Sequence, residues 1–145
     1  MFSRKGFTIL ELLIVIAVIG ILVGIALPRF KGMQDEGNIA RAKGELRMLQ
    51  TAVESYIIHN NNTAPATLSV LTSAVPAITG TTLPKDPFNT GADYGYAVNG
   101  TNYVVWSRGQ ALNGSAAISA LGVVTETNGA SCIYATNGTP VDLQP

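Results

Sequence analysis

Apolar residues dominate the start of the chain in one nearly unbroken run. From Phe7 to Leu27 the sequence has 21 residues and a single charged side chain, Glu11. About 20 consecutive apolar residues are enough to cross a bilayer as an α-helix. A helix that is apolar on all sides also suits lipid better than the surface of a globular domain. The pattern therefore predicts a membrane-spanning helix over residues 7–27.

Beyond this run the pattern becomes amphipathic, which predicts that the same helix continues. From about Gln34, apolar residues recur in steps of three and four, the spacing of one helix face: Ile39, Ala42, Leu46, Leu49, Val53, Tyr56 and Ile57. Charged residues lie largely off this stripe, at Arg41, Lys43, Glu45, Arg47 and Glu54. We expect one helix over residues 7–58, whose amphipathic half falls in segment 28–60 and ends at the polar run 59–62.

The junction between the two halves contains residues that favour close helix contact and a break. Gly20 and Gly24 form a G-x-x-x-G pair inside the apolar run, a spacing that lets another helix approach. Pro28 lacks a backbone donor and loosens or kinks a helix at its position. We expect the helix to lose regular hydrogen bonding between Gly20 and Pro28 when subunits assemble.

The remaining segment, 61–145, has the composition of a small domain with short elements. Thr67–Ser73 predicts a short helix, capped by Thr67 and stopped before Pro76. Asn99-Gly100 between two Tyr- and Val-rich runs predicts a hairpin. Its expected pairs are Val98 with Thr101, Tyr96 with Tyr103, and Tyr94 with Val105, on a face that packs against the helix stripe. Ser131–Thr136 predicts a third strand, and the fold class is α+β.

Composition argues against several functions. Nine basic and nine acidic residues leave no net charge, which gives no support for a nucleic-acid partner. The one histidine, His59, adjoins an asparagine run and is interpreted as solvated, and no catalytic triad or phosphate-binding loop is present. Cys132 is alone and is either a small buried residue or a partner for another chain. Asp86 and Asp93 flank a turn-rich loop, where capping of the backbone is favoured over calcium binding. We expect no enzymatic activity and no metal or other cofactor.

The charges around the apolar run bear on its topology. The run is longer than the apolar core of an ordinary secretory signal, and Arg29 and Lys31 follow it in place of a small-residue cleavage site. Arg4 and Lys5 lie on its short N-terminal side, which is the easier side to retain in the cytoplasm. We therefore expect a retained helix with the bulk of the chain outside the cytoplasm.

The first residues resemble a known processing signal. Arg4-Lys5-Gly6-Phe7-Thr8, followed by Ile9-Leu10-Glu11-Leu12-Leu13, is similar to the class III signal of type IV pilins and type II secretion pseudopilins. The resemblance is strong over residues 4–28 and implies a pilin-like fold. It also implies that a prepilin peptidase cuts between Gly6 and Phe7, releasing a leader of residues 1–6, and methylates the new amino terminus of Phe7. Glu11 takes the place of the family's acidic residue.

Two further features indicate a subtype. Leu83–Phe88 resembles the LPxDPW segment of major pseudopilins, and one cysteine replaces the pair found in many type IV pilins. The chain is therefore identified as most like a major pseudopilin, with a type IV pilin for adhesion, motility or DNA uptake as the alternative. A membrane-anchored binding domain is a more remote one. The stretch Ser107–Ser119, where major pseudopilins often carry an acid-rich calcium loop, contains no acid.

Glu11 is the residue that the family resemblance explains best. A carboxylate in a membrane helix costs about 2.5–3.5 kcal/mol at the centre on the translocon scale, and Glu11 is nearer one end. It either extends to the lipid head groups or pairs with a cation. Cleavage creates such a cation at Phe7, on the same chain at i, i+4 or on a neighbouring subunit.

The resemblance implies a bacterial inner-membrane protein that self-assembles into a helical filament in the periplasm or at the cell surface. Its implied partners are the prepilin peptidase, the inner-membrane assembly platform and minor pseudopilins. The leader is expected in the cytoplasm and the globular domain, 61–145, in the periplasm.

Overall fold

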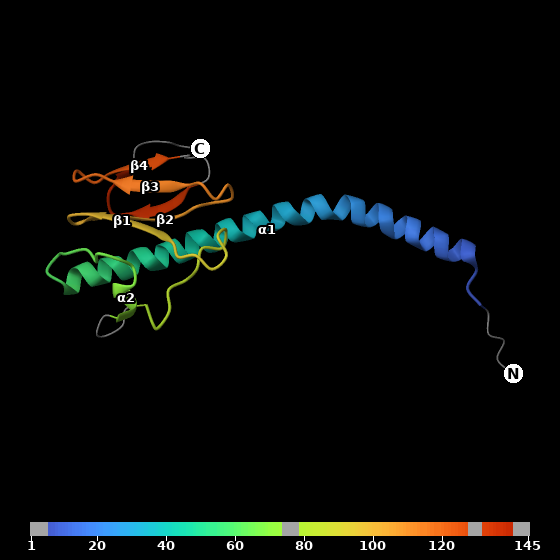
Figure 1. Ribbon diagram of the computed structural model, residues 1–145, viewed down its shortest axis with the longest axis horizontal. Helices are drawn as coiled ribbons and strands as arrows, with labels where there is room; N and C mark the ends of the chain where they lie inside the picture. Colours follow the sequence, from blue (N-terminus) through green and yellow to red (C-terminus); the bar gives the residue numbers. More distant parts are fainter. Residues whose placement is uncertain (1–5, 74–78, 128–131, 141–145) are drawn as a thin grey trace. The chain divides into compact units, whose positions relative to one another are not determined.

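The computed structural model describes residues 6–73, 79–127 and 132–140 of the chain (Figure 1). Two helices come first, α1 (Ile9–His59) and α2 (Val70–Ser73). Six strands follow: β1 (Gly95–Asn99), β2 (Asn102–Ser107), β3 (Ser115–Ile118), β4 (Val123–Thr127), β5 (Ile133–Thr136) and β6 (Thr139–Pro140). The chain divides into two compact units between Glu36 and Gly37.

The unit before Gly37 consists of the first part of α1. Its backbone is helical from Ile9 onward, including Gly20, Gly24 and Pro28. All residues from Gly6 to Gln34 are exposed, apart from Pro28, whose side chain is not described. This part of α1 therefore has no core of its own within the described chain.

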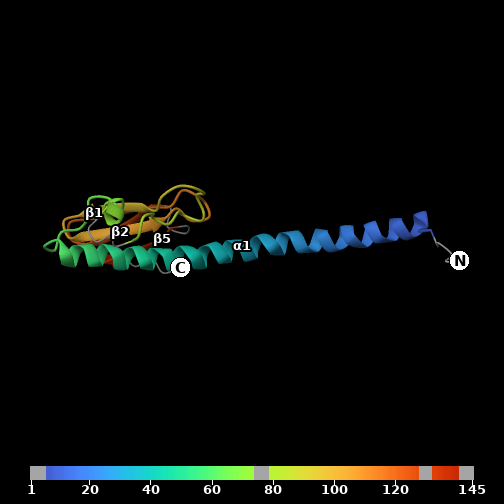
Figure 2. The same cartoon turned by 90° about the horizontal axis from the view of Figure 1, so that it is seen from below.

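The unit from Gly37 onward is built in three layers, in which one sheet lies between α1 and a second sheet (Figures 1 and 2). The first sheet has the order β1-β2-β5 and is antiparallel; the second has the order β3-β4-β6, with β4 and β6 parallel. Helix and sheets confirm the predicted α+β class. The second sheet was not predicted from the sequence.

The helix stripe packs on the first sheet as expected. Leu46, Leu49 and Val53 are buried in a cluster with Tyr103 and Val105 of β2. On the opposite face of β2, Val104 is buried with Ala116, Ile118 and Val124 of the second sheet. Because successive side chains of a strand point to opposite faces, β2 contributes to both cores, and the helix-facing side of the predicted hairpin is confirmed.

The register of the hairpin differs from the prediction. Asn99 pairs with Asn102, Val98 with Tyr103 and Tyr96 with Val105, so the expected pairs were wrong by two positions. The turn residues are Gly100 and Thr101, and Gly100 has a φ of +64°. A glycine at the first turn position suits a type II′ turn, whereas the prediction assumed the asparagine there. A shift of two residues leaves every side chain on its original face.

Local signals set the ends of the helices. After α1, Asn61 and Asn62 adopt φ values of 53° and 59°, and the Asn62 amide donates to the Ile57 carbonyl at 3.0 Å. Asparagine tolerates this left-handed conformation, so the polar run ends the helix as predicted.

The second helix is shorter than the expected Thr67–Ser73, since α2 starts at Val70. Thr67 contributes its carbonyl to the first turn, and its hydroxyl contacts Ser69 instead of capping an amide. The expected stop before Pro76, and Ser131 of the third strand, lie outside the described residues.

Candidate functional site

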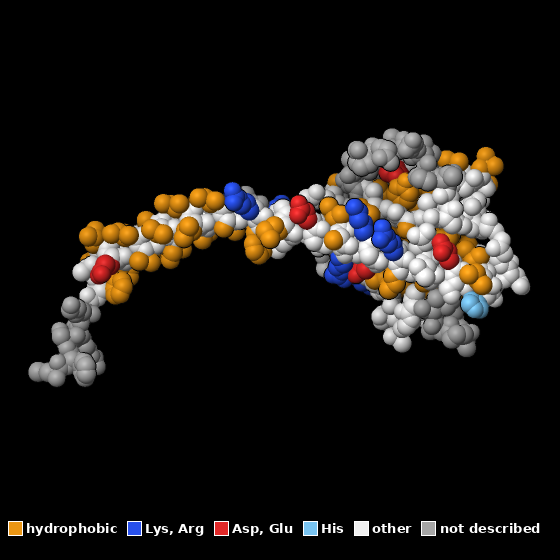
Figure 3. All heavy atoms as spheres, turned by 180° about the vertical axis from the view of Figure 1, so that it is seen from behind, with side chains coloured by type: hydrophobic (Ala, Val, Ile, Leu, Met, Phe, Trp, Pro, Cys, Tyr) orange, Lys and Arg blue, Asp and Glu red, His pale blue; other side chains and the backbone are white. Residues whose placement is uncertain are grey.

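The surface of the first unit is its main functional feature. Large apolar side chains are exposed along it, among them Phe7 at 77%, Ile9 at 82% and Leu22 at 62%. Figure 3 shows these apolar side chains covering the visible face of the helix before the first lysines and arginines. Within the described residues, α1 is the one helix long and apolar enough to cross a membrane, and an 18-residue stretch of it has a mean hydropathy of 3.0. An apolar surface of this extent requires lipid or neighbouring helices.

The predicted cleavage site lies in irregular backbone just before this helix. Gly6 and Phe7 have no regular secondary structure, and α1 begins two residues after Phe7. Both residues are exposed. A protease can reach an exposed peptide bond outside regular secondary structure, and the bond between Gly6 and Phe7 is such a bond.

Glu11 is engaged locally at the start of α1. Its Oε2 atom accepts hydrogen bonds from the Thr8 amide and the Thr8 hydroxyl, both at 3.0 Å. In return, the Glu11 amide donates to Thr8 Oγ1 at 3.2 Å. This reciprocal arrangement is a capping box, which satisfies amides that the first helical turn leaves unpaired. This capping box was not predicted from the sequence, although Thr-x-x-Glu before an apolar run is its known signal.

The small residues of the apolar helix offer space for another helix. A Cβ atom built on Gly20 or Gly24 meets nothing within 4 Å outside the helix itself. The pair therefore forms an open, shallow surface in the single chain. Pro28 continues the helix in this state, and the expected loss of helical bonds concerns the assembled state.

Comparison with known proteins agrees with the N-terminal geometry. Residues 1–27 match the prokaryotic N-terminal methylation motif. The type IV major fimbrial protein FimA of Dichelobacter nodosus is 30% identical over 103 residues, which cover 68% of this chain and 66% of FimA. The chain belongs to the type IV pilin and pseudopilin family.

Other pilin-family relatives match shorter parts. The fimbrial protein EcpB of Eikenella corrodens is 49% identical over 59 residues, 41% of this chain and 37% of EcpB. The type II secretion system core protein G of Pseudomonas aeruginosa is 29% identical over 84 residues, 58% of each chain. The chain thus spans less than half of the length of some curated relatives that it matches. No solved structure matches the chain.

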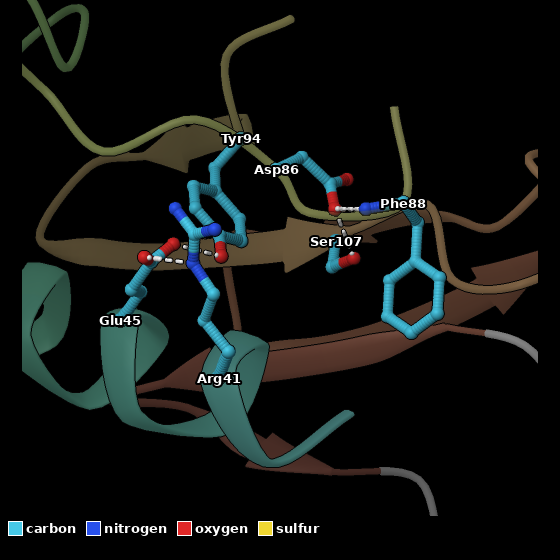
Figure 4. A network of polar contacts seen from close by, with 6 residues as sticks. All are labelled: Arg41, Glu45, Asp86, Phe88, Tyr94 and Ser107. Atoms are coloured by element: carbon cyan, nitrogen blue, oxygen red, sulfur yellow. Dashed lines mark hydrogen bonds and ion pairs between the residues drawn. The ribbon is translucent and has the colours of Figure 1, made fainter. Parts of the chain in front are cut away.

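In this pilin-family chain, two carboxylates that lie off the apolar stripe join α1 to the first sheet and to the residue just before it. Glu45 accepts a hydrogen bond from the Tyr94 hydroxyl at 2.6 Å and one from Arg41 Nε at 2.7 Å (Figure 4). Glu54 accepts one from the Tyr103 hydroxyl at 3.1 Å. Burial raises the pKa of both tyrosines well above the usual value, and the adjacent carboxylates raise it further. These contacts fix the helix on the sheet.

The two aspartates of the turn-rich loop have different roles. Asp86 is buried and accepts hydrogen bonds from backbone amides and from Ser107, which confirms loop capping for this residue (Figure 4). Asp93 is exposed and pairs with Lys85 at 2.7 Å. In the described chain, no cluster of three or more His, Cys, Asp or Glu residues suited to a metal ion is found.

The remaining candidate groups show no catalytic arrangement among the described residues. His59 is exposed, and its Nδ1 atom lies 2.7 Å from the Ser55 carbonyl at the end of α1. Cys132 is half-buried beside the second core, and burial raises the pKa of its thiol to about 12. A thiol with a raised pKa is a weak nucleophile, which favours the packing interpretation of Cys132.

Proposed function

We propose that the chain is the structural subunit of a helical filament whose core consists of the apolar helices of many copies. The observation that carries this proposal is the exposed apolar surface of residues 7–27, interrupted only by Glu11. Lipid covers this surface before assembly, and neighbouring subunits cover it afterwards. Gly20 and Gly24 supply positions where helices approach closely.

Cleavage between Gly6 and Phe7 prepares the subunit for this transfer. The prepilin peptidase releases residues 1–6, and the new Phe7 ammonium, which becomes methylated, lies one residue from Thr8. A carboxylate has about four acceptor positions. Glu11 therefore keeps its bonds from Thr8 while it also binds an ammonium group.

Glu11 then directs docking between subunits. In the apolar filament core, an unpaired Phe7 ammonium costs several kcal/mol, and pairing with a carboxylate removes much of that cost. The acid of an incoming subunit meets the terminus of one already in place. Such a head-to-tail contact does not close on itself and therefore propagates as a filament.

The proposed location follows from the same helix. The precursor spans the inner membrane with residues 1–6 in the cytoplasm and the sheet-containing unit in the periplasm. An inner-membrane assembly platform and minor pseudopilins are the proposed partners. The subunit acts by assembly and has no enzymatic role in this proposal.

Among filament types, we favour a pseudopilus that supports type II protein secretion. Leu83–Phe88 supports this subtype, as does the single cysteine. The relative named type II secretion system core protein G is consistent with it. The second candidate is a type IV pilus, which the greater coverage of the relative named FimA favours.

Charge removal at Glu11 tests the filament proposal. Glu11→Val and Glu11→Gln are expected to be cleaved and inserted normally but to form few filaments, with Glu11→Val the more defective. Mass spectrometry verifies cleavage first, and electron microscopy with shearing assays measures filaments. Glu36→Gln, a matched change at an exposed acid beyond the apolar run, should assemble normally. Normal filaments from cleaved Glu11→Val would show that this acid has no pairing role.

Complementation separates the two subtypes. The chain is expressed in one strain that lacks its major pseudopilin and in another that lacks its major type IV pilin. Restored export of secreted enzymes in the first strain alone supports the pseudopilin assignment. Restored surface filaments and motility in the second strain alone would transfer the assignment to the pilus.

A further inference from the structure

A buried carboxylate holds together two loops that lie far apart in the sequence. Asp86 is 2% exposed and belongs to the loop before β1. Its Oδ1 atom accepts hydrogen bonds from the Phe88 amide at 3.0 Å and the Ser107 hydroxyl at 2.8 Å. Its Oδ2 atom accepts one from the Arg108 amide at 2.9 Å. Figure 4 shows the Asp86 carboxylate directed toward Phe88 and Ser107.

These contacts fix the end of β2 and the loop that follows it. Ser107 is buried, and its hydroxyl oxygen also accepts a hydrogen bond from the Gly109 amide at 3.2 Å. A chain of bonds therefore runs from the Asp86 carboxylate through Ser107 into the loop. Since a buried carboxylate is costly without donors, these hydrogen bonds offset the cost of burying Asp86 and hold the loop in place.

The loop itself is closed by backbone contacts. The Gly114 amide donates to the Arg108 carbonyl, and the Leu112 amide donates to the Gly109 carbonyl, both at 3.1 Å. A Cβ atom on Gly114 would lie 2.7 Å from the Arg108 carbonyl oxygen, so this close approach requires glycine. The loop is thus closed at Arg108, the residue whose amide donates to Asp86.

The donor set does not fit calcium. Calcium takes six to eight oxygen ligands, usually including several carboxylates. The stretch Ser107–Ser119 supplies no carboxylate. The oxygens of Asp86 face N–H and O–H donors, which would have to be displaced before a cation could bind. Among the described residues, no metal-binding group of acids and histidines lies elsewhere.

We propose that Asp86, through Ser107 and the Arg108 amide, holds the loop after β2 in place, a role that calcium has in the pseudopilins that this chain resembles. The folded subunit is therefore independent of calcium. The inference goes beyond the proposed function. It holds for a pseudopilus and for a pilus alike, because it concerns the folded subunit and not the route of assembly.

Thermal unfolding of the full chain in detergent tests the proposal. Neither calcium chloride nor excess EGTA should shift the Tm of the unaltered chain, and terbium should give no luminescence sensitised by Trp106, which adjoins Ser107. Asp86→Asn replaces a carboxylate oxygen with an NH2 group, which cannot accept the hydrogen bonds that this oxygen accepts. The substitution should lower the Tm by roughly 10 °C. The matched control is Asp93→Asn, at the exposed aspartate of the same loop, which should change the Tm by a few degrees at most.

A local measurement covers the case in which Asp86→Asn does not fold. Ser107→Ala keeps the carboxylate and should increase trypsin cleavage after Arg108 several-fold, detected by mass spectrometry. Two results would overturn the proposal. One is a calcium-dependent rise in the Tm of the unaltered chain that Asp86→Asn abolishes. The other is a Tm and an Arg108 cleavage rate that both substitutions leave unchanged.

Discussion

The hydroxyl of Tyr94 donates a 2.6 Å hydrogen bond to Oε2 of Glu45, and so links the residue before β1 to the middle of α1 (Figure 4). Arg41 Nε donates to the other oxygen of this carboxylate, Oε1, at 2.7 Å. Tyr94 is buried, whereas the Arg41 side chain is 59% exposed. The tyrosine bond is therefore the less solvated of the two contacts with Glu45, and it joins helix to sheet.

Tyr94→Phe should destabilise the sheet-containing unit more than Tyr96→Phe. Hydrogen bonds to charged acceptors contribute about 1.5–3 kcal/mol and neutral ones about 0.5–1.5 kcal/mol. Tyr94 donates to a carboxylate, whereas Tyr96 donates to the Pro65 carbonyl at 2.7 Å. Urea unfolding of a truncated chain beginning at Gln34 measures both losses. Equal losses would mean that the charge of Glu45 adds nothing.

Stability should fall in alkaline solution. Burial and the neighbouring carboxylates raise the pKa of Tyr94 and Tyr103 in the folded chain. Above the pKa of an unfolded tyrosine, about 10, the unfolded state releases protons that the folded state retains. The contribution of the raised pKa is thus complete below about pH 10 and is lost as pH rises further. Urea midpoints between neutral and strongly alkaline pH measure this slope, and the double variant with phenylalanine at both positions should flatten it. An unchanged slope in that variant would assign the effect to other groups.

Leu49 and Met48 are adjacent in sequence and should respond very differently to truncation. Leu49 is 0% exposed in the core against β2, and Met48 is 47% exposed. Leu49→Ala should cost about 2–5 kcal/mol because it leaves a cavity. Met48→Ala should change stability by about 0.5 kcal/mol or less. Chemical denaturation compares the two, and a loss near zero for Leu49→Ala would show that the stripe does not pack on its own sheet in solution.

Processing gives a direct chemical readout. Protein from a host with a prepilin peptidase should begin at Phe7 and carry one added methyl group, as determined by mass spectrometry. Gly6→Leu should block the cut, because a branched side chain replaces the glycine at the accessible bond. An intact amino terminus on the unaltered chain in a competent host would refute the assignment.

The position of Pro28 leads to a prediction about the helix in the assembled filament. Its backbone is helical in the single chain, as are Gly20 and Gly24. In the filament we expect the segment between Gly20 and Pro28 to lose regular hydrogen bonds, since Pro28 contributes no amide there. Electron cryomicroscopy of filaments resolves this directly. Unbroken helix through Ala26 would contradict the prediction, and Pro28→Ala should favour that outcome.

Periodic patterns predicted the parts of the fold that depend on one face of one element. The spacing from Ile39 to Ile57 identified the helix stripe because burial follows helical geometry closely. The helix-facing side of the hairpin was predicted even with a wrong register, since a shift of two preserves the alternation of faces. Asn99-Gly100 and Gly100-Thr101 both place a glycine in the turn, so local chemistry alone did not choose between them.

Features that depend on distant partners were missed. The strand Ser115–Ile118 is short and rich in small residues, and it is stabilised by packing on Val104 and Val124. The tyrosine donors to Glu45 and Glu54 were not predicted, because they lie 49 residues away in the sequence. The donors from Ser107 and Arg108 to Asp86 are also distant in sequence, at separations of 21 and 22 residues. The capping box of Thr8 and Glu11 is different, since its signal was present and was overlooked.

The position of β5 in the chain determines when a newly made subunit can finish folding. Ile133 and Ala135 of β5 complete the core that begins with Leu46 and Leu49, and β5 supplies the second neighbour of β2. During translation the ribosome delivers the helix stripe long before this strand. An unfinished chain therefore exposes the stripe and an unpaired edge of β2, features that favour aggregation and recognition by chaperones.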